Sequence, residues 1–372
     1  MKFSEILKRS YLKVFYNSFF HYQVEYNNFN PKSEGNYIIL SNYPSYDLAV
    51  YISLMLKKQP YIAVNEVYLY NENLRNKLGN FDKLIKLKDN KVDVTGVKKI
   101  LSCLDENNSV LLFPEEKLSM FGVNTKISIS IAKLIKKANK DVLIAKADGA
   151  SLSMPNWGKR VFRGYIELNF EVILKKADLK NMSVEEISDM VSEHIVYDDN
   201  KWNKENLLWH RRNRSIKGIE NHLYLCPKCK EHQTLSVKKS DIYCDNCGYV
   251  TSFNEFSVLT GLNFSSINDW GKLQINSIDK VKEKIVYTQG TMYMIESLSK
   301  DILSLKHADI ELNGGYLFVQ NNMKEYSFEI ENINGLKLIS KNFLYLRYKK
   351  KEFLFELDDC LLIYDLLMNL KS

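Results

Sequence analysis

The most specific chemical pattern in this 372-residue chain is a set of four cysteines. Cys226 and Cys229 form one Cys-x2-Cys pair, and Cys244 and Cys247 form a second pair farther along the chain. Two pairs at this spacing place four thiolates around one tetrahedral Zn²⁺. Four protein ligands leave no open position for a catalytic water, so we expect a structural zinc ribbon. Two disulfides or an iron–sulfur cluster are alternatives that compartment and spacing disfavour.

The residues around this cysteine pattern leave its partner open. The ribbon could be a folding staple for a small core or a protein-contact module, and these two roles are favoured. Lysine and tyrosine side chains on it could contact an anionic partner or be ordinary surface: Lys228, Lys230, Lys238, Lys239, Tyr243 and Tyr249. The two other cysteines, Cys103 and Cys360, lie alone in helix-like stretches and are expected to be buried thiols.

A second group of candidate residues falls in two loops of the N-terminal half. The loop "SNYPSYD" (41–47) contains Asn42, Tyr43, Ser45 and Asp47. The loop "FPEEKLS" (113–119) contains Phe113, Pro114 and Glu115. Between them, the segment "KLIKLKDNK" (83–91) contributes the basic residues Lys86 and Lys88. A carboxylate beside a proton acceptor suits general acid–base chemistry, and lysines suit phosphate binding.

Both loops follow short apolar runs that alternate with helical stretches. Strands are predicted over 36–42, 60–66, 82–87, 109–115 and 141–147, and helices over 47–58, 92–108 and 128–140. The stretch 160–175 is expected to form strands that close this domain. Such alternation indicates an α/β domain with a largely parallel sheet. Chemistry in these sheets usually sits in loops beyond the carboxyl ends of the strands, where both loops fall.

The order of these features over residues 1–215 resembles the lysophospholipid acyltransferases, specifically the 1-acylglycerol-3-phosphate acyltransferase family. An N-terminal interfacial helix precedes a strand that ends in Ser41-Asn42, and "VLLFPEEKLSMFG" (110–122) resembles the family's Phe-Pro-Glu-Gly block. Glu116 stands where that block has glycine. The stretch "SLSMPNWGKRVFRG" (151–164) and the later cysteines resemble a bacterial subset of the family that carries a zinc ribbon.

The resemblance implies a reaction and roles for the candidate residues. In the family, a histidine five residues before an aspartate takes the proton of a lysophospholipid hydroxyl, which attacks an acyl thioester. Asp47 corresponds to that aspartate, whereas Phe113, Pro114 and Glu115, with Lys86 or Lys88, would hold the acceptor phosphate. Asn42 and Ser45 would line the same substrate site. The acyl donor would be acyl-CoA or an acyl-carrier protein.

The family's histidine is missing from this chain. Aligned on Ser41-Asn42, its place is held by Tyr43, and aligned on Asp47 with the family spacing it is held by Asn42. All histidines of the chain are remote in sequence: His21, His194, His210, His222, His232 and His307. Either Tyr43 or Asp47 acts as a poor base, giving a slow enzyme, or the chain is a degenerate acyltransferase that binds lipid or recruits a partner.

The C-terminal part follows a different pattern. We predict an acyltransferase-like domain over 1–215, a zinc ribbon and linker over 216–280, and a β-rich domain over 281–372. Short strands with turn signals such as Asn313-Gly314-Gly315 precede a final helix over 358–371, begun by an aspartate able to cap it. An antiparallel barrel or sandwich closed by a helix resembles a pleckstrin-homology or GRAM-type domain.

Composition and charge set the expected location. The net charge of +7 favours anionic partners without choosing among them, and nucleic acid is the least favoured. Residues 1–26 are predicted to form an amphipathic helix, with Phe3, Ile6, Leu7, Val14 and Phe15 on its apolar side. Charged residues interrupt any secretory signal, and no long apolar run predicts a membrane span. We expect a cytoplasmic protein with peripheral contact at the inner face of the membrane.

Overall fold

The computed structural model describes residues 3–33, 35–42, 46–70, 83–88, 93–158, 161–210, 216–282, 285–295 and 303–371. Backbone contacts divide the chain into two compact units. Unit 1 comprises residues 1–156, 160–213 and 255–257, and unit 2 comprises residues 157–159, 214–254 and 258–372. The cysteine ribbon and the C-terminal strands therefore share unit 2, and the finer division at residues 215 and 280 stays a prediction.

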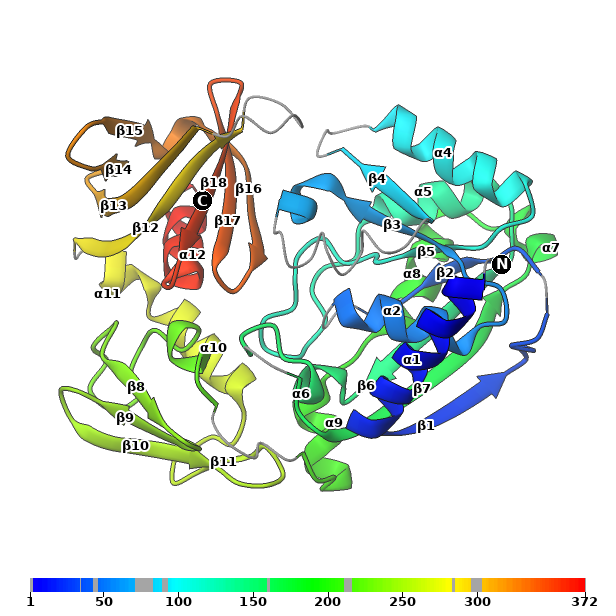
Figure 1. Cartoon of the computed structure of the whole chain (residues 1–372), viewed down its shortest axis with the longest axis horizontal. Coiled ribbons are helices and arrows are strands. Elements are labelled where there is room, and N and C mark those ends of the chain that lie inside the picture. Colours follow the sequence, from blue (N-terminus) through cyan, green and yellow to red (C-terminus); the bar gives the residue numbers. More distant parts are fainter. Residues whose placement is uncertain are drawn as a thin grey trace. The chain divides into compact units, whose positions relative to one another are not determined.

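Unit 1 is built on a seven-stranded sheet in the order β1-β7-β6-β2-β5-β3-β4 (Figure 1). Its strands are β1 (Phe20–Asn27), β2 (Ile38–Leu40), β3 (Tyr61–Asn65), β4 (Leu84–Leu87), β5 (Val110–Leu112), β6 (Val142–Asp148) and β7 (Gly164–Leu174). All neighbours run parallel except β6 and β7. The predicted α/β class with a largely parallel sheet is therefore confirmed.

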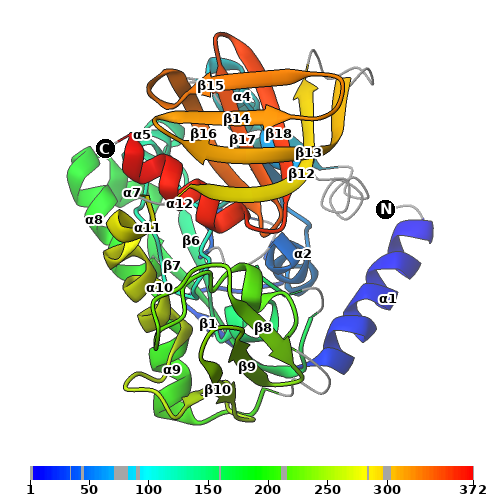
Figure 2. The same ribbon diagram turned by 90° about the vertical axis from the view of Figure 1, so that its left-hand side faces the viewer.

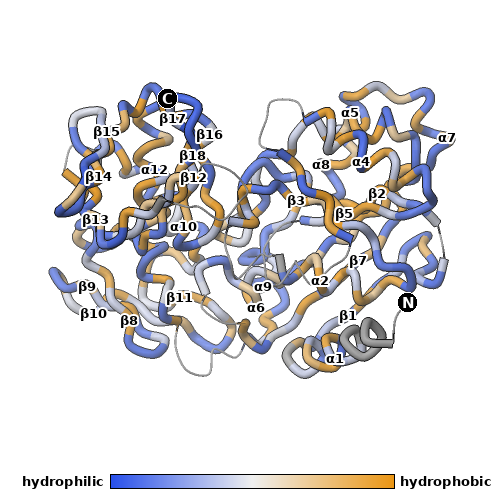
Figure 3. The backbone as a smooth tube through the Cα atoms, turned by 45° about the horizontal axis from the view of Figure 1, so that its top comes forward, coloured by the Kyte–Doolittle hydropathy of each residue, from blue (hydrophilic) through white to orange (hydrophobic). Residues whose placement is uncertain are grey.

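Helices cover both faces of this sheet, which explains its continuous apolar strands. The helices α1 (Phe3–Phe19) and α2 (Tyr46–Met55) pack on one face, against Ile39, Leu111 and Leu143. The helices α4 (Val94–Asp105), α5 (Ile129–Ala138) and α8 (Val184–Ile195) pack on the other face. In Figure 3, β2 and β5 accordingly lie in hydrophobic stretches of the chain.

Short elements complete unit 1: η1 (Glu66–Tyr70), α6 (Ala150–Ser153), α7 (Lys176–Leu179) and α9 (Asp199–Asn206). Local sequence signals set several boundaries. The Ser183 hydroxyl accepts from the Glu186 N–H, and the Glu186 carboxylate accepts from the Ser183 N–H, so a capping box starts α8. Asn139, with φ of 48°, ends α5 in the left-handed conformation that asparagine tolerates.

Two predicted elements of unit 1 are wrong in detail. The helix predicted from residue 1 to residue 26 ends at Phe19, and the next eight residues form β1, parallel to β7. The sequence "FHYQVEYN" has apolar residues at alternate positions, which is the period-2 pattern of a strand, and the helix prediction did not use this signal. Residues 160–175 were expected to hold several strands, but the described part of this stretch, from residue 161, has one long strand, β7.

The first part of unit 2 is a small antiparallel sheet in the order β11-β10-β9-β8. Its strands are β8 (Leu235–Lys238), β9 (Asp241–Cys244), β10 (Gly248–Phe253) and β11 (Leu259–Thr260), preceded by η2 (Ile219–Asn221). The helices α10 (Ile267–Asn276) and α11 (Ile278–Lys282) follow. Trp270 of α10 is completely buried and donates from Nε1 to the Leu225 carbonyl at 2.8 Å, which ties the helix to the first cysteine pair.

The rest of unit 2 is a curled antiparallel sheet in the order β15-β14-β13-β12-β18-β17-β16. Its elements are β12 (Val286–Ile295), β13 (Leu303–Asn313), β14 (Tyr316–Gln320), β15 (Glu325–Glu329), η3 (Ile330–Asn332), β16 (Ile333–Ser340), β17 (Phe343–Tyr348) and β18 (Lys351–Leu357). Phe328 of β15 packs edge-to-face on Tyr348 of β17 and Phe353 of β18, so strands distant in the sheet order meet around one core.

The helix α12 (Cys360–Leu370) packs along this sheet (Figure 2). Its N-cap is Asp359, as expected, but the Asp359 side chain does not cap the helix. It accepts instead from the Thr288 hydroxyl at 2.9 Å and the Gln233 amide at 3.1 Å, so this carboxylate joins the ribbon to the curled sheet. Of the two lone cysteines, Cys360 is buried, as predicted, whereas Cys103 is only half-buried.

Candidate functional site: strand ends of unit 1 and a four-cysteine centre

The two candidate loops begin side by side in the structure. Strand β2 lies between β5 and β6, with Leu40 paired to Leu112 and to Ile144. The Ser41 N–H donates to the Leu112 carbonyl at 3.2 Å, which extends the pairing of β2 and β5 to the first loop residue. The three loops that follow β2, β5 and β6 therefore leave the sheet at the carboxyl ends of these strands, where ligands bind in open α/β sheets. We call this side of the sheet the strand-end edge, as distinct from the edge strand β4.

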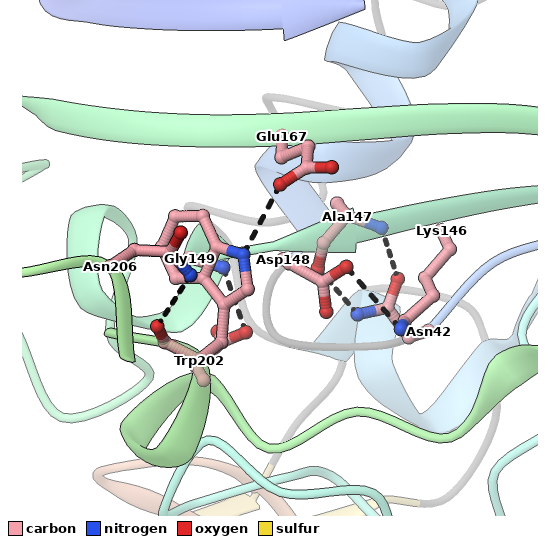
Figure 4. Close-up of polar contacts among 9 residues, drawn as sticks. Asn42, Lys146, Ala147, Asp148, Gly149, Glu167, Trp202 and Asn206 are labelled. Carbon is pink, nitrogen blue, oxygen red and sulfur yellow. Dashed lines mark hydrogen bonds and ion pairs between the residues drawn. The ribbon is translucent and has the colours of Figure 1, made fainter. Parts of the chain in front are cut away.

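Asn42 is buried and ties the first loop to β6 (Figure 4). Its side-chain amide donates to the Ala147 carbonyl at 2.7 Å and accepts from the Ala147 N–H at 2.8 Å. This pair of bonds makes the side chain an extension of the parallel ladder. The geometry thus gives Asn42 a positioning role, and a direct contact with substrate stays a prediction. Tyr43 and Ser45, the other predicted residues of this loop, lie outside the described residues.

Asp47 lies in the first turn of α2 and contacts a phenol hydroxyl from α1. The Tyr16 hydroxyl, from α1, donates to Asp47 Oδ1 at 3.5 Å. Burial, with the charge of Asp47 next to it, raises the pKa of Tyr16 far above its ordinary value. Tyr16 is therefore a neutral hydrogen-bond donor at physiological pH and is not suited to act as a general base.

The described histidines of unit 1 are engaged elsewhere. His210 is buried, with Nδ1 at 2.9 Å from the Leu208 carbonyl and Nε2 at 3.3 Å from the Tyr165 carbonyl. His194 Nδ1 lies 2.8 Å from the Met190 carbonyl, one turn earlier in α8. The ring of His21 packs on that of Tyr165. These three described side chains therefore hydrogen-bond or pack within unit 1.

Glu115 lies in a clamped loop after β5. Its Oε2 accepts from the Thr125 N–H at 2.7 Å, and its backbone pairs with Ile127 in an isolated bridge. Burial raises the pKa of Glu115 to about 8, against the opposing effect of the Thr125 hydrogen bonds. A carboxyl group with this pKa is mostly protonated at neutral pH. Glu115 can therefore donate a hydrogen bond to an anion that a carboxylate would repel.

The other predicted phosphate-binding residues are arranged unequally. Phe113 packs against the core beside α2, and Pro114 is buried. Lys86 and Lys88 are exposed on or just after β4, which is the edge strand. Because β5 and β3 separate β4 from β2, the lysines lie roughly 14 Å from the first loop, at about 4.8 Å per strand.

Several polar residues at this edge were not expected from the sequence. Lys146 and Asp148, at the end of β6, form an ion pair at 3.3 Å, and burial raises the pKa of Asp148 (Figure 4). Asp199 is completely buried and accepts from the N–H groups of Gly149 and Ser151, each at 2.8 Å. Burial raises the pKa of Asp199 to about 7 despite these bonds.

Tyr197 connects these carboxyl groups electrostatically. It is buried, and burial together with the charges of Glu115, Asp199 and Asp148 raises its pKa well above the ordinary value for tyrosine. Opposite Asp148 in the sheet lies Glu167, which accepts from Trp202 Nε1 at 3.2 Å (Figure 4). In the sequence, the signals for this carboxyl cluster are the glycine after β6 and the helix-capping pattern at 198–201, and neither indicates that the carboxyl groups lie together.

The four cysteines of unit 2 converge as their spacing predicts. The sulfurs of Cys226, Cys229, Cys244 and Cys247 all lie within 4.8 Å of one another. Two of the separations, Cys226 to Cys247 and Cys229 to Cys244, are 3.6 Å. A disulfide would need about 2.05 Å, whereas thiolates around one tetrahedral zinc lie about 3.8 Å apart. The four cysteines could therefore hold one metal ion.

No protein-family model matches the sequence, and neither does any curated protein. Among solved structures, the chain is similar to the 1-acyl-sn-glycerophosphate (LPA) acyltransferase, PlsC, from Thermotoga maritima. The match covers 52% of this chain and 75% of that chain, with 18% sequence identity and a TM-score of 0.41. A similarity at this level does not decide which reaction, if any, the chain carries out.

Proposed function

We propose that unit 1 transfers an acyl group from a thioester, on CoA or an acyl-carrier protein, to the hydroxyl of a lysophospholipid. One observation carries the proposal. The pairing of β2 with β5 brings the Ser41-Asn42 loop and the Phe113-Pro114-Glu115 loop to the same sheet edge, although about 70 residues separate them. These are the two blocks by which the sequence resembles the family, and a shared site requires their proximity.

In the proposed reaction, Asp47 assists removal of the proton from the acceptor hydroxyl, and Tyr43 occupies the place of the family base. Glu115, protonated at neutral pH, donates to the acceptor phosphate or to the developing oxyanion. Lys86 and Lys88 attract the anionic headgroup from the edge of the sheet. Because a general base contributes about 10²–10⁴-fold, we expect slow turnover rather than none.

The proposed location is the cytoplasmic face of the membrane. No described helix is long and apolar enough to cross a bilayer. Helix α1 exposes Tyr11 and Val14 by more than two thirds and Phe15 by 38%. Apolar side chains on an exposed helix face suit insertion into the headgroup region. The side chains of Phe3, Ile6 and Leu7, which were predicted to share this face, lie outside those described.

The metal of the cysteine centre is proposed to be zinc, bound by Cys226, Cys229, Cys244 and Cys247. Four thiolate ligands close the coordination sphere, so the ion would stabilise unit 2 and take no part in acyl transfer. The ribbon and the curled sheet remain candidates for binding a protein partner.

The alternative is a degenerate acyltransferase that binds lipid or a partner without turnover. It is favoured by the internal use of the site's polar groups. Both ends of the Asn42 amide bond to β6, and Asp47 accepts from Tyr16. Side chains that hydrogen-bond within the protein in this way stabilise the loop, and fewer polar groups are then left to bind or activate a substrate.

Acyl transfer by the purified chain separates the two functions. Lysophosphatidic acid would be supplied with a panel of acyl-CoA and acyl-carrier donors, and product formation compared with that of Glu115→Ala and Tyr43→His. The enzyme predicts measurable product, less product with Glu115→Ala, and faster turnover when Tyr43→His restores the family base. Binding of lysophosphatidic acid with no product from any of the three proteins would establish the degenerate alternative.

A further inference from the structure

Strand β1 is one of the two edge strands of the sheet in unit 1 (Figure 1). It pairs with β7 over its whole length, from Phe20 to Asn27, without a register shift. In the described part of the chain, no backbone hydrogen bond is made to the other side of β1. That side therefore presents a row of unpaired N–H and C=O groups, to which a further strand can bond.

The other edge strands carry features that block such pairing, and β1 does not. Strand β4, at the opposite edge of the same sheet, has four residues and the exposed lysines Lys86 and Lys88. In unit 2, β8 is short and ends in a lysine, β11 has two residues, β15 has a glutamate at each end, and β16 has a lysine and two register shifts. Short strands, charged residues and bulges are the usual means by which proteins protect an edge. Strand β1 has eight residues with no lysine, proline or register shift, and Glu25 is its one carboxylate.

The side chains of β1 divide between two faces of the sheet. Phe20, Tyr22 and Val24 pack with residues of α1 and α2. The opposite face is polar and exposed, with His21, Gln23, Glu25 and Asn27. A strand that adds to this edge must match face with face, because side chains alternate along both strands. This condition leaves few registers for any partner.

We propose that β1 pairs antiparallel with β1 of a second copy of this chain, about a two-fold axis through Gln23. Gln23 then lies opposite Gln23 of the second copy, and His21 lies opposite Glu25 of the second copy, twice by symmetry. Side-chain amides bond to each other, and an imidazole N–H donates to a carboxylate, so the polar face is complementary to itself. The proposal goes beyond the function proposed for unit 1 and does not depend on acyl transfer.

The same register also suits the apolar face. Tyr22 lies opposite Val24 of the second copy, and aromatic residues pair favourably with β-branched residues across strands. An axis through Val24 would instead place Glu25 opposite Gln23 and His21 opposite Asn27. The Asn27 amide already donates to the Asn169 side chain at 3.0 Å, and Glu25 would have no imidazole partner. The axis through Gln23 is therefore the favoured one.

The symmetry of this pairing agrees with the proposed membrane contact. A two-fold axis through an antiparallel pair is perpendicular to the sheet, so each face of the sheet continues into the same face of the second copy. Helix α1 packs on one face in each copy. Both α1 helices would therefore lie on one side of the dimer, and the exposed Tyr11 and Val14 of both could contact one membrane.

The test is sedimentation equilibrium of the zinc-loaded full-length chain without lipid. One strand pair makes a smaller interface than the roughly 1,600 Å² of a standard complex, so we expect a dissociation constant on the order of 10 µM. The informative variant, Gln23→Lys, places two ammonium groups opposite each other on the axis. The matched control, Gln289→Lys, makes the same change at an exposed position of β12, which is an inner strand of the curled sheet.

A second pair of variants tests the register. His21→Glu places a carboxylate opposite Glu25 of the second copy. The double variant His21→Glu with Glu25→His exchanges the two groups and restores an imidazole opposite a carboxylate. Because both positions are exposed, neither variant should change the thermal midpoint of unfolding by more than a few degrees.

We expect a reversible monomer–dimer equilibrium for the natural chain. Gln23→Lys should weaken dimerisation on the order of tenfold, since like charges directly opposite each other repel. Gln289→Lys should behave like the natural chain. His21→Glu should also weaken the dimer, and the double variant should recover most of the loss.

Four results would overturn the proposal. A natural chain that stays monomeric at about 100 µM would show that the edge of β1 does not pair with itself. A dimer that Gln23→Lys leaves unchanged would be formed by another surface. Equal weakening by Gln23→Lys and Gln289→Lys would indicate general charge repulsion. A double variant that dimerises no better than His21→Glu would contradict the register, and with it the two-fold pairing of β1.

Discussion

The strand-end site of unit 1 and the cysteine centre of unit 2 hold their polar groups in different ways. At the strand ends, Asn42, Glu115 and Asp199 each bond to backbone groups of other segments. In the ribbon, four sulfurs from two short pairs point to one common centre. The first arrangement fixes loops and shifts the pKa values of buried carboxyl groups. The second creates a single closed coordination site.

This difference separates what each site can be asked to do. A side chain that hydrogen-bonds to the backbone holds its segment in place. Its removal should therefore lower the stability of unit 1, and any loss of function would follow from the displaced segment. Thiolates that converge on one centre repel one another until a metal ion binds. Loss of the metal should therefore unfold the segment that carries them. The predictions below probe this contrast in order of expected effect.

The largest effect is expected from Cys226→Ser in the cysteine centre. Binding of a structural zinc contributes on the order of 10 kcal/mol in small domains. This is comparable to the whole free energy of unfolding of a typical domain. The variant should lose its zinc, about one equivalent per chain, and residues 220–255 should exchange their amide hydrogens freely. Because Trp270 bonds to Leu225 and Tyr224 donates to Asp365, we expect protection to fall in α10 and α12 as well.

Metal analysis and hydrogen exchange with mass spectrometry would check this outcome. Cys103→Ser, at a half-buried thiol of unit 1, is the matched control and should keep both the zinc and the protection of unit 2. Normal exchange protection in the ribbon of a zinc-free Cys226→Ser protein would show that the metal is not needed for the fold.

Asn42→Ala should destabilise unit 1 by about 3 kcal/mol. The substitution leaves the buried N–H and carbonyl of Ala147 without their partner, and each unsatisfied group costs about 1–3 kcal/mol. Urea unfolding would measure the change. Asn27→Ala removes an exposed hydrogen bond from the Asn27 side-chain amide to that of Asn169, and it should change the unfolding free energy by less than about 0.5 kcal/mol. Equal effects of the two substitutions would contradict the positioning role of Asn42.

Glu115→Gln should change how stability depends on pH. The folded state raises the pKa of Glu115 from 4.5 to about 8, so it binds more protons than the unfolded state between these values. The natural chain therefore loses stability as pH rises through this window, whereas glutamine keeps the acceptor for Thr125 and cannot ionise. We expect the variant to gain on the order of 3 kcal/mol relative to the natural chain from pH 5 to pH 8.

Denaturant unfolding at a series of pH values would detect this gain. Glu116→Gln, at the exposed neighbouring residue, provides a control with the same change of charge. A stability difference between Glu115→Gln and the natural chain that stays constant with pH would mean that the Glu115 carboxyl is not buried as described.

The smallest effect is expected from Tyr16→Phe. The hydroxyl makes a long bond of 3.5 Å to Asp47, and the ring remains packed on Phe20 and Tyr51 without it. We expect a loss of about 0.5 kcal/mol in unfolding free energy. A loss of more than about 2 kcal/mol would show that Asp47 is held mainly as a structural partner of α1.

How much of each site could be predicted follows from the range of its contacts. The cysteine pairs are local in sequence, so spacing alone predicts the chemistry. The two loops of unit 1 could be placed at one edge because the carboxyl ends of parallel strands meet there. The partners of Asp199 lie 48 and 50 residues away, and no local pattern indicates a carboxyl group that caps the turn after β6.

Strand β1 shows a second limit of prediction from sequence. Its residues directly continue an amphipathic helix without a glycine or proline between them, so no breaker marks the boundary at Phe19. Parallel pairing with β7, more than 140 residues later, decides the conformation. The alternation of apolar residues from Phe20 to Tyr26 agrees with this strand, whereas no local signal indicates that the Asp359 side chain bonds to Gln233 of the ribbon and not to its own helix.

The most direct test of the proposed acyl transfer is the initial rate of phosphatidic acid formation by the natural chain and by Asp47→Ala. Both proteins would be zinc-loaded, at matched concentration, with lysophosphatidic acid and the best acyl donor from the panel. The proposed site predicts slow but measurable transfer that falls about 10²-fold or more with Asp47→Ala. Equal rates for the two proteins, or no product from either at long times and high concentration, would contradict an active site at the strand ends.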